Sequence, residues 1–474
     1  MKKYNTFIFE EHAFDPASGT ISLHYSLDGE IRFTETLIVP MQGSSITESE
    51  ELDRALFALH LAGGASYYKT CCPKQIELKS GSLTKKEADF WNAVYENGLG
   101  EFFFKNKLDF RGLISFPSSQ RPAVSDKHSE KPKTKNQKRI LIPVGGGKDS
   151  IVTIELLKAA GFDCTLLRMG HHPVIDRIAE MAGLPLITVD RHLSPALFDL
   201  NAQGALNGHI PITAYLSFVS LIVAMLHDFD AVALSNERSA NIGNVSYLGR
   251  EINHQWSKSA EFERLLRTHL QQSIGTDIEI FSALRPFSEL SIVERFTTYP
   301  QYFALATSCN KNWKILRDQS TGFSPSPLGP PKRTGSVRAG GGGKGVGAWC
   351  GTCPKCAFVF SLYAAFLPKK ELERIFGSNF FDRKELEPLY RELLGLQGFK
   401  PFECVGTPEE TKAAFLLAHK RGDLEDTAVM KMFVKEILPG INDPKNLVKE
   451  TLESNDNDAI SKEFPRPKVL GPQY

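Results

Sequence analysis

Short apolar runs alternate with longer amphipathic segments through the middle of the chain. The runs that predict strands are 140–144, 164–167, 186–189, 231–234 and 278–282. The segments with helical spacing are 151–160, 173–182 and the stretch that follows Pro211. Strands that alternate with helices of this length favour a parallel sheet covered on both faces. Ligands of such sheets bind at the carboxyl ends of the strands.

The N-terminal quarter has a mixed pattern of strand-like and helix-like segments. Strands are predicted at 20–25, 31–39 and 75–78, and helices at 49–61 and 85–95. No residue pattern in this part indicates chemistry. The adjacent Cys71 and Cys72 are interpreted as buried small apolar residues rather than a redox couple. This part is predicted to form a small α+β domain.

Two segments of different composition interrupt the pattern. Residues 118–138 are rich in Ser, Pro and Lys and are interpreted as a solvated linker, with a nucleic-acid-binding arm as the alternative. Residues 320–347 are rich in Gly, Pro and Ser and are interpreted as a loop, with an active-site lid as one role for it. The predicted parts are an N-terminal domain (1–117), a linker (118–138), a nucleotide-binding domain (139–300) and a cysteine-cluster and helical region (301–474).

Composition narrows the class of protein. The chain has 474 residues with 56 Lys plus Arg against 55 Asp plus Glu, so a net charge of +1 argues against a globally basic nucleic-acid binder. The longest apolar run, 210–226, contains Pro211 and several hydroxyl side chains, which favours a buried helix over a membrane span. The first residues resemble no signal peptide, and eight cysteines are too few for a disulfide scaffold. A cytoplasmic protein with no membrane partner is expected.

A glycine-rich loop joins the first strand of the central series to its helix. Its residues are Gly145, Gly146, Gly147, Lys148, Asp149 and Ser150. Successive glycines let backbone N–H groups close around an anion, and a helix N-terminus adds positive potential. A P-loop needs Ser or Thr after Gly-Lys, and a dinucleotide fingerprint needs G-x-G-x-x-G, so neither fits. The loop predicts a phosphate or diphosphate site, with a glycine turn capped by Asp149 as the alternative.

The loop resembles that of the PP-loop ATP pyrophosphatases, which release diphosphate from ATP and form adenylates. Their pattern is Ser-Gly-Gly-x-Asp-Ser after the first strand of a doubly wound sheet, and Gly145 stands here where serine is usual. The resemblance implies that Asp149 helps to hold Mg²⁺ and that Ser150 binds phosphate. It also implies an α/β fold with a doubly wound parallel sheet of this type, beside the N-terminal α+β domain and a helical C-terminal region.

Further polar segments follow the predicted strands. His171 and His172 come after the second strand, where such enzymes receive adenosine, although a capping or surface role explains them equally. Residues 235–241 are dense in polar groups and include Asn236 and Glu237, which are candidates for nucleotide binding and catalysis. His254 and Lys258 lie four residues apart and would share a helix face, with a solvated face as the alternative.

Three cysteines are bunched near the start of the C-terminal region. Cys350, Cys353 and Cys356 have C-x2-C-x2-C spacing, and Cys309 is the candidate for a fourth ligand. Four thiolates suit a closed tetrahedral zinc site that would stabilise the structure of this region. An iron–sulfur cluster is the competing interpretation, but the ferredoxin pattern would need a cysteine at Phe360.

Four parts of the sequence together resemble one family. They are the glycine loop, the segments 235–241 and 253–259, and the sequence WCGTCPKC at 349–356. The family they resemble is the MurL family, the ATP-dependent UDP-N-acetylmuramoyl-L-alanyl-L-glutamate epimerases of peptidoglycan synthesis. The resemblance extends from the N-terminal domain to about residue 430. It implies an isomerase that converts the terminal L-glutamate of UDP-MurNAc-L-Ala-L-Glu to D-glutamate, with ATP and Mg²⁺, releasing AMP and diphosphate.

Epimerisation also needs groups that move a proton at Cα. The candidates are His171, His172, His209, Glu237 and His254, because His and Glu side chains can be tuned toward neutral pH. A PP-loop enzyme that modifies nucleobases or tRNA is the alternative function. A zinc-stabilised nucleic-acid-binding protein is a third interpretation, and it leaves the glycine loop unexplained.

Overall fold

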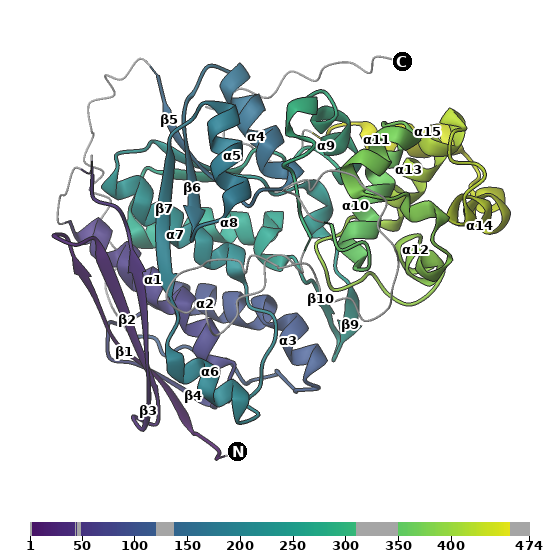
Figure 1. Cartoon of the computed structure of the whole chain (residues 1–474). Coiled ribbons are helices and arrows are strands. Elements are labelled where there is room, and N and C mark those ends of the chain that lie inside the picture. The colour runs from purple at the N-terminus through teal and green to yellow at the C-terminus, as the bar shows by residue number, and fades with distance from the viewer. Residues whose placement is uncertain (1, 43, 45–48, 120–136, 310–348, 456–474) are drawn as a thin grey trace.

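The computed structural model describes residues 2–42, 44, 49–119, 137–309 and 349–455. A large twisted sheet with helices on both faces occupies one side of the molecule, and a group of C-terminal helices packs against it (Figure 1). Most of the predicted linker and all of the Gly/Pro-rich segment 320–347 lie outside the described residues. The predicted domain boundaries therefore stay predictions.

Nine strands form the principal sheet, in the order β11-β8-β5-β6-β7-β3-β2-β1-β4. In chain order the strands are β1 (Thr6–Asp15), β2 (Thr20–Leu27), β3 (Ile31–Ile38), β4 (Gln75–Leu78), β5 (Arg139–Pro143), β6 (Asp163–Met169), β7 (Leu186–His192), β8 (Ala231–Leu234) and β11 (Glu279–Ser282). A separate hairpin consists of β9 (Val245–Tyr247) and β10 (Arg250–Ile252).

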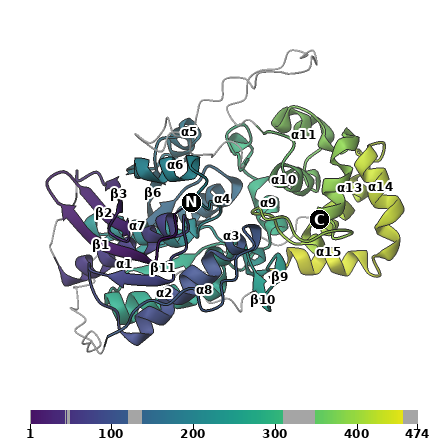
Figure 2. The same ribbon diagram turned by 90° about the horizontal axis from the view of Figure 1, so that it is seen from below.

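Helices cover the sheet and make up the C-terminal region, which Figure 2 shows from below. They are α1 (Glu50–Tyr68), α2 (Lys85–Gly98), α3 (Gly100–Lys105), α4 (Lys148–Ala159), α5 (Pro173–Ala182), α6 (Pro195–Ala202), α7 (Ile212–Leu226), α8 (Ala260–His269), α9 (Glu289–Phe296), α10 (Pro354–Ala364), α11 (Lys369–Phe376), α12 (Glu387–Leu393), α13 (Pro408–Arg421), α14 (Ala428–Glu436) and α15 (Pro444–Leu452).

The strands β11, β8, β5, β6 and β7 are parallel, as the apolar pattern predicts. β5 lies at the centre, and the chain builds outward first through β6 and β7 and then through β8 and β11. This is the doubly wound order, in which a ligand crevice opens beside the central strand where the winding reverses. That position lies between β5 and β8, whose register pairs Leu141 with Val232.

Alternate residues of β5 belong to two different cores. Ile140 and Ile142 pack with α4, α5, α9 and the C-terminal helices, whereas Leu141 packs with α1, α7 and α8 on the other face. The two-residue period of a strand produces this division, because successive side chains point to opposite faces. Both faces are fully covered, which explains why β5 is apolar throughout.

The N-terminal strands continue the same sheet, a connection that the apolar pattern does not predict. β3 pairs antiparallel with β7, so that Leu37 lies opposite Arg191. β1 is also absent from the predicted strands, because its second half alternates between half-buried and exposed residues and carries several charges. α1 continues to Tyr68, past the predicted end at 61, because Gly63 and Gly64 lie tightly against aromatic side chains rather than ending the helix.

A buried polar cluster holds the two halves of the sheet together. Glu35 of β3 is fully buried and accepts hydrogen bonds from Arg191 Nε (2.8 Å), Tyr67 Oη (2.8 Å) and Tyr215 Oη (2.6 Å). These partners come from β7, α1 and α7, so one carboxylate connects four elements. Breaking a buried ion pair from one side leaves an uncompensated charge behind.

Replacement of Glu35 by Ala is therefore expected to lower the free energy of unfolding by about 3–5 kcal/mol, because Arg191 would lose its buried counter-charge. The exposed Glu30, which pairs with Lys2, provides the matched control, and Glu30→Ala should cost less than about 1 kcal/mol. Urea unfolding measures both. Equal losses in the two variants would contradict the assigned role of Glu35.

Candidate active site

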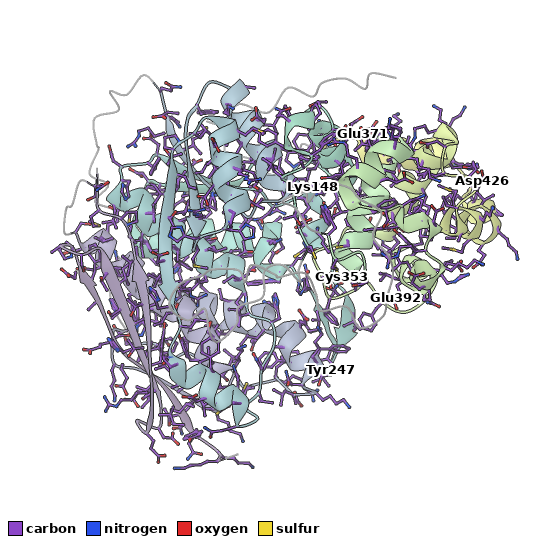
Figure 3. The ribbon with its side chains drawn as sticks, viewed as in Figure 1. Lys148, Tyr247, Cys353, Glu371, Glu392 and Asp426 are labelled. Atoms are coloured by element: carbon purple, nitrogen blue, oxygen red, sulfur yellow. The ribbon has the colours of Figure 1, made fainter. Side chains whose placement is uncertain are left out.

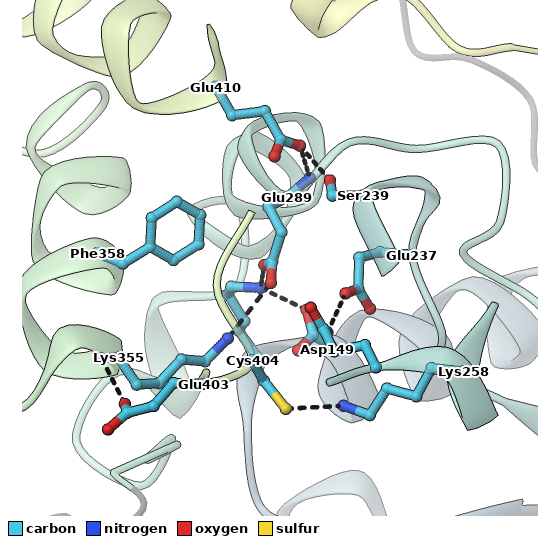
Figure 4. Close-up of polar contacts among 12 residues, drawn as sticks. Asp149, Glu237, Ser239, Lys258, Glu289, Lys355, Phe358, Glu403, Cys404 and Glu410 are labelled. Carbon is cyan, nitrogen blue, oxygen red and sulfur yellow. Dashed lines mark hydrogen bonds and ion pairs between the residues drawn. The ribbon is translucent and has the colours of Figure 1, made fainter. Parts of the chain in front are cut away.

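The candidate site lies where the loops after β5, β8 and β11 meet the C-terminal helices. Figure 3 shows Lys148 and Cys353 at this border, and Figure 4 shows the side chains that converge there. The loops come from the carboxyl ends of neighbouring parallel strands, so their functional groups reach the same edge of the sheet. Among the described helices none is long and apolar enough to span a membrane.

The glycine loop leaves the N-terminus of α4 open. Gly146 has a φ of 77°, which favours glycine, and its carbonyl accepts a hydrogen bond from Thr307 N at 3.0 Å. Gly147 is the N-cap residue and provides no side-chain cap, so the first N–H groups of α4 are available to an anion. Asp149 is the second residue of the helix, so the alternative of a glycine turn capped by Asp149 is wrong.

Two buried hydroxyl groups near this loop have no hydrogen-bond partner among the described residues. One is Thr307 Oγ1, next to the glycine loop, and the other is Ser235 Oγ, directly after β8. From the β5–β8 register, Ser235 lies level with the point where the glycine loop begins. Buried hydroxyls are normally hydrogen-bonded, so these two are suited to a ligand with oxygen atoms. Ser150 Oγ, by contrast, donates to Gly147 O at 3.0 Å.

A buried cluster of charges lies at the start of α4. Lys148 Nζ forms ion pairs with Asp149 and Glu289, and Lys355 Nζ lies 3.3 Å from Glu289. Burial raises the pKa of Glu289, but the two ammonium groups outweigh burial and lower it to about 2. Burial opposes the charge of Lys148, yet its two carboxylate partners raise the pKa above its usual value. Lys148 therefore stays cationic at neutral pH.

Asp149 is the most accessible carboxylate of this cluster. About a quarter of its side chain is exposed, whereas Glu289 is almost fully buried. Burial raises the pKa of Asp149, and Lys148 opposes that effect. A carboxylate beside an open helix N-terminus is placed to share a divalent cation with a bound phosphate.

Arg285 holds the loop after β8 in place. Its guanidinium donates to Glu237 O at 2.8 Å and to Lys258 O at 2.6 Å, and it pairs with Glu263 at 2.9 Å. Glu237 Oε1 in turn accepts from Gln255 Nε2 at 3.0 Å. The two polar segments noted in the sequence are thereby fixed side by side.

Asn236, predicted as a nucleotide ligand, is buried and donates to Ser282 Oγ at 3.0 Å.

His254 does not lie on a helix face with Lys258 as predicted. It precedes the short helix η2 (Trp256–Lys258), and its Nδ1 is hydrogen-bonded to Glu101 of α3. Burial lowers the pKa of His254, but Cys404 and Glu101 raise it to about 9. His209 lies against it, with 4.4 Å between the ring centroids, and burial followed by the charge of His254 lowers the pKa of His209 to about 3. His254 is the cationic member of this pair.

Cys404 lies on the other side of His254. Its Sγ is 3.8 Å from His254 Nε2 and 3.4 Å from Lys258 Nζ. Burial raises the pKa of the thiol, but Lys258 and then His254 outweigh it and lower the pKa to about 6. The charge of Cys404 in turn raises the pKa of Lys258. Cys404 is therefore a thiolate at neutral pH, flanked by two cations.

The two histidines after β6 have local contacts. His171 Nδ1 lies 3.0 Å from Arg168 Nη2, and its Nε2 is 3.7 Å from Asp190. His172 is the N-cap of α5, where its Nδ1 accepts from Val174 N at 3.1 Å. The structure thus gives His172 the capping role that the sequence left open.

The four predicted cysteine ligands come together, and their sulfur atoms all lie within 4.8 Å of one another. These residues are Cys309, Cys350, Cys353 and Cys356. The Sγ atoms of Cys350 and Cys356 are 3.6 Å apart. A zinc ion bound by four thiolates at about 2.3 Å requires similar sulfur separations, so the set fits that ion. Lys355 projects from within this motif toward Glu289, so the cluster positions one of the site's two buried ammonium groups.

Several site residues were not found from the sequence. Glu289 is the first residue of α9 after β11, so the rule that sites form at strand ends identifies it once β11 is recognised. Glu410 accepts from Ser239 Oγ at 2.5 Å and from Glu289 N at 2.7 Å, and its capping box with Thr407 is visible in the sequence. Cys404 is a single cysteine in a loop, with no local pattern to mark it.

Family models and curated relatives match most of the chain. A model of the MurL N-terminal domain matches residues 1–283, and one of the MurL C-terminal domain matches residues 340–446. The UDP-N-acetyl-alpha-D-muramoyl-L-alanyl-L-glutamate epimerase of Xanthomonas oryzae pv. oryzae is 37% identical over 453 residues, which is 94% of this chain and 93% of that protein. The proteins of the same name from a Micromonospora strain and from Salinispora tropica are each 36% identical over 92% of this chain, and the matches cover 92% and 90% of those proteins.

Proposed function

The chain belongs to the MurL family of epimerases, and on that premise we propose that it inverts the terminal L-glutamate of UDP-MurNAc-L-Ala-L-Glu to D-glutamate. It is an enzyme of the isomerase class. The reaction consumes ATP, passes through an acyl-adenylate and releases AMP and diphosphate. It serves peptidoglycan precursor synthesis, and its nucleotide substrates make the cytoplasm the expected location.

The open N-terminus of α4 carries this proposal. A loop of three glycines provides no side-chain cap for the first N–H groups of α4 within the described part of the chain, at the position where the winding of a parallel sheet reverses. The buried Lys148 and Lys355 add two cations. The hydroxyl groups of Ser235 and Thr307 have no hydrogen-bond partner among the described residues, so a ligand could bond to them. These groups suit a triphosphate that is to be cleaved.

Activation of the substrate carboxylate explains why an epimerase would use ATP. An α-carboxylate already carries negative charge, so removing the adjacent Cα proton would concentrate a second charge on the same atoms. Joining the carboxylate to AMP gives a neutral acyl group that can accept the electron pair as an enolate. Water then cleaves the adenylate after the configuration has changed. The ATP site and the proton-transfer groups must therefore be neighbours.

Asp149 fits the role of a Mg²⁺ ligand. Its carboxylate is partly exposed, lies next to the open helix N-terminus and would neutralise one charge of the ion. Bound Mg²⁺ supplies charge neutralisation to the diphosphate leaving group. Asp149 would hold the ion at the loop, and Lys148 and Lys355, which pair with Glu289 in this structure, would supply positive charge to the phosphate oxygens.

The four-cysteine set is assigned a structural zinc ion. A closed tetrahedral thiolate site is redox-inactive and leaves no position for substrate, so its role is to fix local structure. Here it fixes the start of α10 and so the position of Lys355. The four cysteines would thus affect the reaction only through the position of Lys355.

Substrate-dependent AMP release tests the proposal. Purified protein is incubated with ATP, Mg²⁺ and either UDP-MurNAc-L-Ala-L-Glu or tRNA, and AMP, diphosphate and D-glutamate are measured. The expected result is one AMP and one diphosphate released per ATP cleaved, only with the muramyl dipeptide, together with D-glutamate. Release with tRNA in place of the dipeptide would instead support a tRNA-modifying enzyme.

A further inference from the structure

We propose that Cys404 is a catalytic residue that exchanges the Cα proton of the activated glutamate on one face, and that His254 and Glu101 position it. This inference rests on the proposed function, because it assigns the proton transfer of that reaction. Cys404 replaces the histidines and Glu237 as the first candidate for this step.

The position of Cys404 matches the geometry that the reaction needs. Adenylation places the substrate carboxylate against the α-phosphate, and Cα is one bond further from the phosphates. Figure 4 draws Cys404 with its partner Lys258, whose Nζ is 3.4 Å from the sulfur, and the charges of Glu237 and Asp149 act on Lys258. The charge of Lys355 acts on Cys404. The Cys404 thiol therefore lies next to the side chains that are proposed to bind phosphate, but it is not one of them.

A chain of side-chain contacts runs from Cys404 through His254 to Glu101. Glu101 holds Nδ1 of His254, and Nε2 of the same ring faces the sulfur at 3.8 Å. Glu101 is itself buried and pairs with Lys105, so its position is fixed. A thiol next to an imidazole that a carboxylate orients is the arrangement that maintains a reactive thiolate.

The loop that carries Cys404 is held against the sheet region from several sides. Asn244 Nδ2 donates to the carbonyls of Lys400 (3.0 Å) and Pro401 (2.8 Å), and Lys400 Nζ donates to Ile242 O at 3.0 Å. Phe402 packs against Phe104, with 5.3 Å between the ring centroids. A loop tied in this way can hold a reacting atom in a defined position.

The other candidates have partners that limit them as bases. Nδ1 of His254 is engaged by Glu101, and the raised pKa of this ring keeps it protonated. His209 has a lowered pKa but pairs with Glu101 and His254 rather than with the phosphate-site residues. Glu237 is 3% exposed and accepts a hydrogen bond from Gln255. Cys404 is a half-buried free thiol, and its partners Lys258 and His254 are cations that favour the thiolate form.

The proton step balances without a further co-reactant. The Cys404 thiolate takes the Cα proton, and the C–H electron pair moves into the acyl group of the adenylate as an enolate. A proton from water forms the new C–H bond on the opposite face. The thiol proton returns to the hydroxide left by that water, so the thiolate is restored and no net proton is consumed.

Two assays on Cys404→Ala and Cys404→Ser separate proton transfer from adenylation. Substrate-dependent exchange of labelled diphosphate into ATP reports adenylate formation, and deuterium uptake at Cα in heavy water reports proton transfer. Both variants are expected to keep diphosphate exchange near the wild-type rate. Deuterium uptake and epimerisation should fall about 10³-fold, within the range that a general base contributes.

Cys72→Ser is the matched control, because Cys72 is also a half-buried free thiol but lies in the N-terminal part, with a pKa raised by burial to about 12. It should retain both activities. Iodoacetamide at neutral pH should modify Cys404 before Cys72, and His254→Gln should slow that modification.

The results that would overturn the inference are distinct from those that would overturn the proposed function. Full deuterium uptake in Cys404→Ala would exclude the thiol as the base. Parallel loss of diphosphate exchange and deuterium uptake in both Cys404 variants would show that Cys404 acts in folding or adenylation instead. If the unmodified enzyme itself lacks substrate-dependent diphosphate exchange, the adenylation step fails before Cys404 is tested.

Discussion

Replacement of Asp149 by Asn is expected to lower diphosphate release and epimerisation together by about 10³-fold, because loss of metal-assisted charge neutralisation costs several kcal/mol in the transition state. The side chain keeps its size, and Lys148 keeps its buried partner Glu289, so the fold should persist. Both activities should fall, because the proposed adenylation would precede proton transfer. Higher Mg²⁺ concentrations should restore part of the rate, since the variant would bind the ion more weakly.

Asp163→Asn is the control for this variant. Asp163 is exposed and lies at the start of β6, at the opposite end of the parallel strands from the glycine loop. This variant should release diphosphate at the wild-type rate, and thermal unfolding of both proteins should be unchanged. An Asp149→Asn enzyme with normal turnover would remove the loop carboxylate from the mechanism.

Replacement of Cys353 by Ser is expected to reduce bound zinc from one equivalent per chain to a small fraction, because zinc ions held by thiolates contribute on the order of 10 kcal/mol to local folding. The start of α10 would lose its anchor, and Lys355 would leave Glu289. Diphosphate release should therefore fall with the zinc content. Metal analysis by mass spectrometry, together with diphosphate release, measures both effects.

The control for the zinc site is Cys71→Ser, a half-buried cysteine outside the cluster, which should keep its zinc and its activity. Iron with acid-labile sulfide in the wild-type protein would instead support the competing iron–sulfur interpretation. Unchanged zinc in Cys353→Ser would refute the four-thiolate site.

The parallel half of the fold could be predicted because each strand and helix there has a clear period. β8 and α5 occur at the predicted residues, and the glycine loop follows β5 as expected. The join between β3 and β7 could not be predicted, because it depends on a long-range pairing through Glu35 and Arg191. Local periodicity contains no information about which distant strand edge a strand will meet.

The candidate site was predictable where its residues form a local motif. The glycine loop and the cysteine set have fixed spacing, and Glu237 lies in a polar segment after a strand. Glu101 and Cys404 come from α3 and from the loop before α13, and each looks ordinary within its own segment. Their significance arises from contacts across more than 140 residues of sequence, with His254 between them. The histidines after β6 show the opposite case, because a motif suggested chemistry and His172 caps a helix.

Oxygen transfer from substrate to AMP is the most direct measurement of the central claim, that the glutamate carboxylate is adenylated before its Cα proton moves. The dipeptide is labelled with ¹⁸O in the α-carboxylate and incubated with enzyme, ATP and Mg²⁺. When water attacks the acyl carbon, the bridging oxygen leaves with AMP, so each AMP should carry one labelled oxygen. AMP without label, or formation of ADP and phosphate alongside D-glutamate, would contradict adenylation of the substrate carboxylate.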